Sequence, residues 1–227
     1  MRRSEINRLM REAEALLETH RFALPPWARW GVDDWRSRPE QARYAARRQM
    51  GWDVTDFGAD RFFERGLLLL CLRNGISGSA HDRPYAEKVM VVREGQETPF
   101  HFHKVKVEDI IVRGGGNLLV ELMNTDVAGA ALDTPVRVVT DDTERTVAAR
   151  EPIRLTPGES ITLPRRLMHR FFGEPGSGAV LAGEVSLVND DRTDNFFLEP
   201  LGRFPGIVED EPPLSPLWSG PDGIGGG

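Results

Sequence analysis

The chain has 227 residues, which is enough for one full-sized domain with additional segments but short for two complete domains. It carries 29 Lys and Arg against 35 Asp and Glu, and the formal net charge of −6 argues against a nucleic-acid or anionic-membrane partner, which usually needs a basic face. Cys71 is the only cysteine, so no intrachain disulfide can form, and a cytoplasmic location is expected.

Two absences in the sequence bear on targeting. The opening residues run into a charged helical pattern without the apolar core of a signal peptide, so none is expected. The longest apolar run, 67–72, is far shorter than the roughly 18 residues of a spanning helix. No membrane partner is therefore predicted.

Residues 1–66 are predicted to form an N-terminal helical segment. Apolar side chains recur there at a spacing of three and four, which places them on one helix face: Ile6, Leu9, Met10, Ala13, Leu16 and Leu17. A second helix is predicted over 39–50, with Pro39 in its first turn and Gly51 as its stop. Between the two helices lie Trp27, Trp30 and Trp35, which are interpreted as a packed connection, with stacking on a sugar as the alternative.

Residues 67–190 have a sequence pattern typical of an all-β sandwich or barrel, because short apolar runs alternate with Gly, Pro, Asn and Asp. The predicted strands are 67–73, 87–93, 98–103, 108–112, 117–123, 135–140, 145–149, 153–155, 160–163, 168–173 and 179–188. Thr156-Pro157-Gly158-Glu159 is typical of a type II turn, since glycine accepts the positive φ of the third position.

The remainder of the chain is rich in Asp, Pro and Gly. Residues 191–218 keep enough aromatic and aliphatic side chains to be predicted as an ordered segment that wraps the barrel. Residues 219–227 are mostly glycine, with too little apolar surface to offset the entropy of ordering, and are predicted to form a flexible tail.

Three of the five histidines have the character of metal ligands. His101 and His103 are two residues apart on a predicted strand, so both side chains point to the same face. A tight turn after His103 can return the Glu108 carboxylate to the same ion, and His169 can complete the set from a distant strand. A His-x-His pair alone is more often structural, but Glu108 at this spacing favours a metal site.

In this region the sequence resembles the cupin superfamily. The first cupin motif is matched by Gly95, His101-Phe102-His103, Glu108 and Gly115. The second motif is matched by Gly158, Pro164 and His169, whereas Arg166 and Gly173 replace its internal glycine and closing asparagine. The resemblance implies a mainly β fold: a cupin jelly-roll β-barrel with the N-terminal helical segment packed on it.

A finer resemblance covers nearly the whole chain. Several runs are similar to the D-lyxose isomerase family of cupin sugar isomerases: 85–90, 96–103, 108–111, 113–116, 183–186, 189–191 and 194–196. This resemblance implies a metal-dependent isomerase that interconverts D-lyxose and D-xylulose through an enediol, with D-mannose and D-fructose as a second expected pair. A monosaccharide is the expected partner, and a homodimer is the expected assembly.

The chemistry of the four ligands agrees with that expectation. Three imidazoles and a carboxylate suit a divalent ion, and Mn²⁺, Zn²⁺, Co²⁺, Fe²⁺ and Ni²⁺ are all compatible with this set. The resemblance favours Mn²⁺ among them. In an octahedral shell, four protein ligands leave two open positions, which can hold two adjacent oxygens of one substrate and polarise them.

A carboxylate must also carry a proton between C1 and C2. Glu184, in the strand 179–188, is the first candidate, with Glu199 second and Glu209 or Asp210 more distant ones. Lys88 is a further catalytic candidate: burying a lysine is costly without a partner, so an inward Lys88 would imply a function, although a lysine paired with a surface acid at the rim fits equally well. Alternation leaves two other lysines ambiguous between the rim and the surface, Lys104 and Lys106.

For the two other histidines and the cysteine, no role in a functional site is predicted. His20 and His81 are expected to be ordinary surface or packing histidines, and Cys71 a buried small hydrophobe.

Other functions share the same four ligands. A cupin dioxygenase would hold iron in a mostly apolar pocket, whereas this chain has many carboxylates and amides after residue 184. A sugar-phosphate isomerase would need clustered cations, and a non-catalytic cupin would bind a sugar without converting it.

Overall fold

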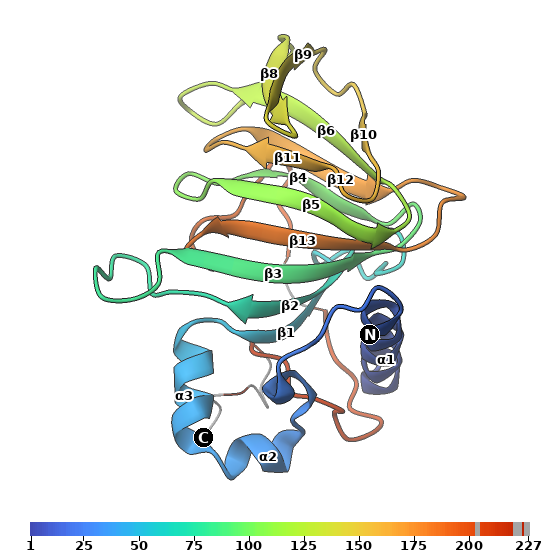
Figure 1. Cartoon of the computed structure of the whole chain (residues 1–227), viewed down its shortest axis with the longest axis vertical. Coiled ribbons are helices and arrows are strands. Elements are labelled where there is room, and N and C mark those ends of the chain that lie inside the picture. The colour runs from blue at the N-terminus through green and yellow to red at the C-terminus, as the bar shows by residue number, and fades with distance from the viewer. Residues whose placement is uncertain (203–204, 220–223, 225–227) are drawn as a thin grey trace.

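In the computed structural model, which describes residues 1–202, 205–219 and 224, antiparallel strands form two sheets that face each other (Figure 1). The larger sheet has the order β1 (Gly51–Thr55), β2 (Leu67–Arg73), β3 (Tyr85–Val92), β13 (Val180–Leu187), β5 (Glu108–Gly115), β11 (Ser160–Leu163), β8 (Val136–Thr140) and β9 (Thr143–Val147). The smaller sheet has the order β10 (Ile153–Leu155), β6 (Leu118–Thr125), β12 (Met168–Gly173), β4 (Glu97–Phe102) and β14 (Phe196–Phe197), and β7 (Ala131–Leu132) pairs with β6.

The predicted strands correspond to these elements closely. The bounds of β2, β10, β11 and β12 are those expected, and the turn before β11 has Gly158 at φ 102° with a Glu159 N–H to Thr156 O hydrogen bond of 2.9 Å. Three short strands were not predicted: β1, β7 and β14. Of these, β1 pairs along its whole length with β2, so 51–55 belong to the barrel sheet and not to the helical segment.

Both predicted helices form; the second begins at Pro39 as predicted but ends earlier, and two short helical elements were not predicted. α1 spans Arg3–Thr19 and α3 spans Pro39–Arg47, while a 3₁₀ turn η1 (Pro26–Arg29) and a short helix α2 (Val32–Arg36) lie between them. α3 does not run to Met50 and is not stopped by Gly51. Gln49 adopts a left-handed φ of 53°, and the N–H groups of Gln49 and Met50 bond to Ala46 O and Ala45 O, which is a Schellman ending.

The apolar face of α1 covers the outer face of one end of the larger sheet. Ile6, Met10 and Leu17 are buried there against side chains of β1 and β2 such as Trp52, Leu68 and Leu70. The tryptophans of the connection pack against one another: Trp30 and Trp35 are edge-to-face with ring centroids 4.9 Å apart, and Trp27 and Trp35 are tilted with centroids 6.1 Å apart. These contacts support the packed interpretation of that connection.

The C-terminal segment runs back along α1. The Met1 amino group donates to Gly206 O at 2.8 Å, Arg3 is paired with Glu209 at 2.7 Å, and Ser4 Oγ donates to Asp210 at 2.7 Å. Glu209 and Asp210 therefore lie at the start of α1 and do not close over the histidines. Of the predicted tail, residues 220–223 and 225–227 lie outside the described residues, and Ile224 is buried beside Gly51.

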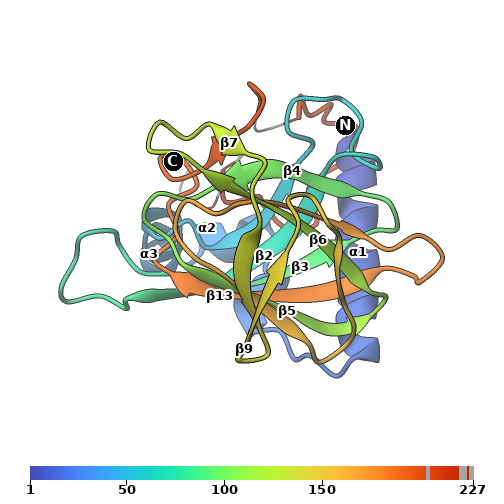
Figure 2. The same cartoon turned by 90° about the horizontal axis from the view of Figure 1, so that it is seen from above.

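The main apolar core lies between the two sheets, formed by inward side chains such as Ile110, Val120 and Leu163. Figure 2 looks down on the barrel from above and shows β4 and β13 on its opposite sides. A mainly β architecture with helices packed on one flank is thus confirmed. Among the described residues, no helix is long and apolar enough to cross a membrane.

Candidate metal centre

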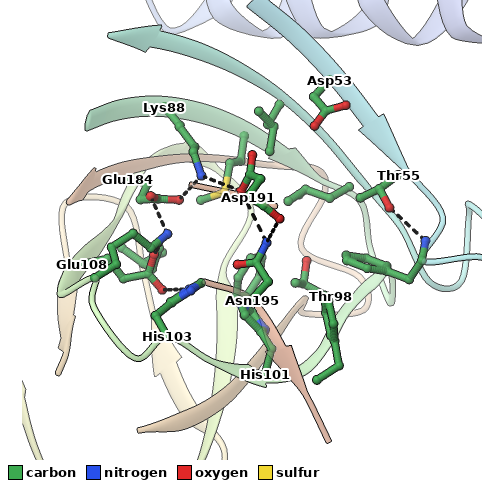
Figure 3. A pocket seen from close by; sticks show the side chains of 18 of the residues that line it. Asp53, Thr55, Lys88, Thr98, His101, His103, Glu108, Glu184, Asp191 and Asn195 are labelled. Atoms are coloured by element: carbon green, nitrogen blue, oxygen red, sulfur yellow. Dashed lines mark hydrogen bonds and ion pairs between the residues drawn. The ribbon is translucent and has the colours of Figure 1, made fainter. Parts of the chain in front are cut away.

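A cavity of about 240 Å³ opens between the two sheets. In Figure 3 the side chains of His101, His103 and Glu108 lie at one end of this cavity, and Thr55 from β1 lies at the other. Both sheets therefore contribute to one site.

Four side chains form the ligand cluster, by which we mean His101, His103, Glu108 and His169. His101 on β4 pairs directly with His169 on β12, His103 follows the end of β4, and Glu108 opens β5. All four are buried, and their ligand atoms lie within 4.8 Å of one another. The set predicted from the sequence is thus brought together.

The tautomers of the three histidines are fixed by backbone carbonyls. Nδ1 of His101, His103 and His169 lies 2.8, 2.7 and 2.9 Å from the carbonyl oxygens of Pro99, Asp194 and Leu167. A carbonyl oxygen can only accept, so each Nδ1 carries the hydrogen, and in the neutral ring Nε2 keeps its lone pair for the centre of the cluster. Burial lowers the pKa of His101 and His103, which keeps these rings neutral.

The residues present fit a divalent cation. Nε2 of His103 and of His169 are buried and have no hydrogen-bond partner within the described part of the chain. They lie 3.4 and 3.1 Å from Glu108 Oε1, so two lone pairs and a carboxylate oxygen converge on one point. Such a convergence is costly unless a cation compensates it, and this donor set is one that first-row divalent metals prefer.

Lys106 neutralises the side of Glu108 that faces away from the histidines. Its Nζ lies 2.6 Å from Glu108 Oε2 and 2.9 Å from Glu184 Oε1. Burial alone would raise the pKa of Glu108, but the Lys106 ammonium holds it well below its usual range. The two carboxylates in turn raise the pKa of Lys106 against the effect of burial, so all three groups are charged.

Lys88 points inward and is buried, which agrees with its interpretation as an inward lysine and not with a lysine at the exposed rim. Its Nζ donates to Asn189 Oδ1 at 2.8 Å and lies 3.3 Å from Glu184 Oε2 and 3.7 Å from Asp191. In Glu184, burial would raise the pKa, yet Lys106 and Lys88 outweigh it and lower that pKa. Lys88 and Glu184 thus lie together beside the ligand cluster (Figure 3).

Glu199 is not brought to the cavity. Phe197 is the last residue of β14 and lines the cavity, whereas Glu199 lies beyond the strand, 67% exposed and paired with Arg65 at 3.4 Å. We therefore withdraw it as a candidate for contact with the substrate.

The remaining lysine, histidine and cysteine candidates differ in whether they are buried or exposed. Lys104 is exposed, with Nζ 3.8 Å from the Phe196 ring centroid, whereas Lys106, two residues later, is buried. His20 packs against Gly114, and His81 is exposed. Cys71 is buried on β2, where burial raises the pKa of its thiol to about 12, in line with a small hydrophobe.

Asp194 is a positioning residue that sequence reasoning missed. Its carboxylate accepts hydrogen bonds from the backbone N–H groups of Lys104, Val105 and Lys106 at 2.8, 3.0 and 2.9 Å. Its carbonyl oxygen accepts the Nδ1 hydrogen of His103 at 2.7 Å. One residue thus holds both the orientation of a ligand and the loop that carries Lys106.

Replacing Asp194 with Asn is expected to weaken metal binding by about 10- to 100-fold, as for other partners that orient ligands. The Asn amide cannot accept three N–H donors, so the loop between His103 and Lys106 loosens. Metal affinity measured by competition with a chelating dye checks this. The matched control is Asp126→Asn, whose carboxylate accepts two backbone N–H groups, both at 2.8 Å, in an exposed turn. Equal affinities for the two variants would contradict the assigned role.

The rim of the cavity includes a contact between two backbones. Gly58 has a φ of 71°, and a β-carbon placed on it would lie 2.8 Å from the Cα of Gly202. Gly202 lines the cavity together with Phe57 and Leu201. The first residues after β1 and the segment after β14 therefore meet without intervening side chains.

Comparisons with known proteins point in one direction. A protein-family model described as D-lyxose isomerase matches residues 1–220. A D-lyxose/D-mannose isomerase of Serratia proteamaculans is 46% identical over 215 residues, 94% of each chain. Another D-lyxose/D-mannose isomerase, from Escherichia coli O157:H7, is 46% identical over 214 residues, 93% of this chain and 94% of that protein.

Solved structures agree at the level of the fold. The L-ribose isomerase of Cellulomonas parahominis with L-ribose has a TM-score of 0.62 and 17% identity, covering 92% of this chain and 98% of its own. That of Acinetobacter sp. DL28 in complex with L-ribose has a TM-score of 0.60 and 17% identity, covering 88% and 93%. At these identities the likeness concerns the fold alone, and the mainly β, cupin-like fold is confirmed.

Proposed function

The chain belongs to the D-lyxose isomerase family, and from this premise we propose that it interconverts D-lyxose and D-xylulose, and D-mannose and D-fructose. The observation that carries the proposal is the buried ligand cluster with its Nε2 atoms turned inward beside a cavity. The cavity wall also carries polar side chains suited to hydroxyl groups, such as Asp53, Thr98 and Asn195. This lining supports a polyol substrate over the apolar substrate of a dioxygenase.

The ligand cluster would hold the cation, for which we propose Mn²⁺. When bound, such an ion supplies Lewis-acid polarisation of two adjacent substrate oxygens. The other residues of the site have to hold the sugar, exclude water and move a proton.

Glu184 is our candidate for moving the proton. In the forward direction a proton leaves C2 of the aldose and returns at C1, while the O2 hydroxyl hydrogen passes to O1, so atoms balance through an enediol. A base for this step must be ionised, and the ammonium groups of Lys106 and Lys88 favour the ionised carboxylate. We propose that Lys88, on the cavity wall, also stabilises negative charge that develops on a substrate oxygen.

Metal removal tests the function. Protein stripped with EDTA is expected to be inactive, and Mn²⁺ is expected to restore conversion of D-lyxose to D-xylulose, followed by NMR. Glu108→Ala should lose both metal and turnover, because it removes a ligand and leaves Lys106 without its shortest ion pair. Glu144→Ala, on the exposed β8–β9 hairpin, is the control and should match the unmodified protein.

Two outcomes would contradict the proposal in different ways. A metal-loaded protein that binds D-lyxose but leaves its signals unchanged over hours is a binding protein and not an isomerase. Turnover that persists after complete removal of the metal would separate the ligand cluster from the reaction.

The assembly and location stay predictions within this proposal. Tyr85, Val185 and Leu187 are exposed on neighbouring strands of the larger sheet, where Tyr85 pairs with Leu187, and this apolar strip supports a homodimer. A cytoplasmic location remains expected for a chain whose single cysteine is a buried thiol.

A further inference from the structure

A β-bulge in β4 turns a second side chain of that strand into the cavity. His101 pairs with His169 and Thr98 pairs with Phe171, so three steps along β4 oppose two steps along β12. In a regular strand, residues three apart point to opposite faces. Because of the extra residue, Thr98 and His101 both line the cavity.

Pro99 is one of the two bulge residues, with Phe100, that stand opposite Arg170. Proline has no N–H to give to a ladder and is tolerated at bulges, and its carbonyl oxygen orients His101. The same irregularity thus fixes a ligand and re-aims its neighbour. Bulges beside sites often serve to aim a side chain.

The Thr98 hydroxyl has no hydrogen-bond partner among the residues that the structure describes, although the residue is only 4% exposed. Leaving a buried hydroxyl unsatisfied costs about 1–3 kcal/mol. Thr55, on the same cavity wall, differs because its Oγ1 accepts the Phe57 N–H at 3.0 Å. The Thr98 hydroxyl therefore requires a partner that enters the cavity.

We propose that Thr98 is a specificity-determining residue that binds a hydroxyl of the sugar at C4 or C5, remote from the two carbons that react. The inference rests on the proposed function and deepens it. Because three steps of the bulged strand span two steps of β12, Thr98 and His101 are separated by roughly 7 Å along the strand, a distance on the scale of an extended pentose. A threonine hydroxyl both donates and accepts, which suits a sugar hydroxyl in either role.

The test uses metal-loaded protein and D-arabinitol, a linear pentitol that cannot isomerise, with affinity measured by calorimetry. Thr98→Val keeps the shape and removes the hydroxyl, and it is expected to weaken pentitol binding by about 3- to 10-fold while metal content is unchanged. Thr98→Ser, which keeps the hydroxyl, should stay within about 2-fold. The control Thr162→Val lies on β11, where its neighbours Ile161 and Leu163 are the buried residues, and should bind as the unmodified protein does.

Pentitol analogues that lack one hydroxyl, measured with the unmodified protein and with Thr98→Val, complete a double-mutant cycle. An analogue that lacks the hydroxyl bound by Thr98, at C4 or at C5, should bind more weakly than D-arabinitol to the unmodified protein. The Thr98→Val variant should bind that analogue and D-arabinitol with the same affinity. Equal losses for both proteins with both analogues, or no pentitol binding by the unmodified protein, would overturn the role of Thr98. Because binding is read without turnover, a protein that binds pentitol through Thr98 yet leaves D-lyxose unconverted refutes the proposed function alone.

Discussion

Replacing Glu184 with Gln is expected to lower kcat on D-lyxose by about 10²- to 10⁴-fold, the contribution typical of a positioned acid–base group. Gln has nearly the same shape but cannot take up a proton. The four ligands are unchanged in this variant, so metal content, measured by elemental analysis of the Mn²⁺-loaded protein, should remain that of the unmodified protein. KM should change much less than kcat, because the proton is transferred in the transition state.

The loss of a buried ion pair must be separated from the loss of a base. Glu121 provides the control: it is also buried and paired, with Arg170 at 2.8 Å, but it lies on the outer face of the smaller sheet. Glu121→Gln should keep kcat within about 2-fold when assayed below its unfolding transition. Similar losses of kcat in both variants, or an active Glu184→Gln, would exclude Glu184 as the proton carrier.

Replacing Lys106 with Met should lower the free energy of unfolding of the metal-free protein by about 3–5 kcal/mol. Met preserves the length and apolar stem of the lysine but leaves Glu108 and Glu184 buried beside each other without their shared cation. Denaturant unfolding, followed by circular dichroism, measures the change. In the metal-loaded protein the loss should be smaller, because the ion compensates part of the charge of Glu108.

Lys104 is the natural comparison, two residues away on the same loop. Its ammonium group lies over the Phe196 ring at the surface, so Lys104→Met should cost no more than about 1 kcal/mol. Combining Lys106→Met with Glu184→Gln should cost less than the sum of the single changes, because one uncompensated carboxylate is removed. A Lys106→Met variant as stable as Lys104→Met would show that the network contributes little.

The parts of the molecule that follow from local pattern were predictable from the sequence. Strands such as β10 and β12 are short apolar runs, and their limits match the turn residues that flank them in the sequence. The ligand cluster was predictable because alternation aligns His101 with His103, and the motif spacing supplies Glu108 and His169. The register between β4 and β12 then brings the distant histidine opposite the near one.

The features that the sequence left ambiguous, missed or misplaced depend on irregular backbone. Lys106 lies in a loop, where strand alternation gives no direction, and only Asp194 from the far end of the chain fixes its orientation. Alternation predicts that Thr98 faces outward, and the bulge at Pro99 reverses it. Glu199 was predicted as the second candidate for the proton carrier, but β14 ends at Phe197, and Glu199 lies beyond it, exposed and paired with Arg65.

The contact between Gly58 and Gly202 limits how this enzyme family member can diversify. Neither residue has a side chain that a substitution could shorten, and a β-carbon at Gly58 would lie 2.8 Å from the Gly202 backbone, so neither residue is expected to be replaced without displacing the backbone. The cavity can instead be enlarged by replacing large apolar side chains of its wall, such as Leu67, Leu69 and Leu201, with smaller ones. Variants selected to accept longer sugars should therefore accumulate truncations at these leucines, while the glycine pair stays unchanged.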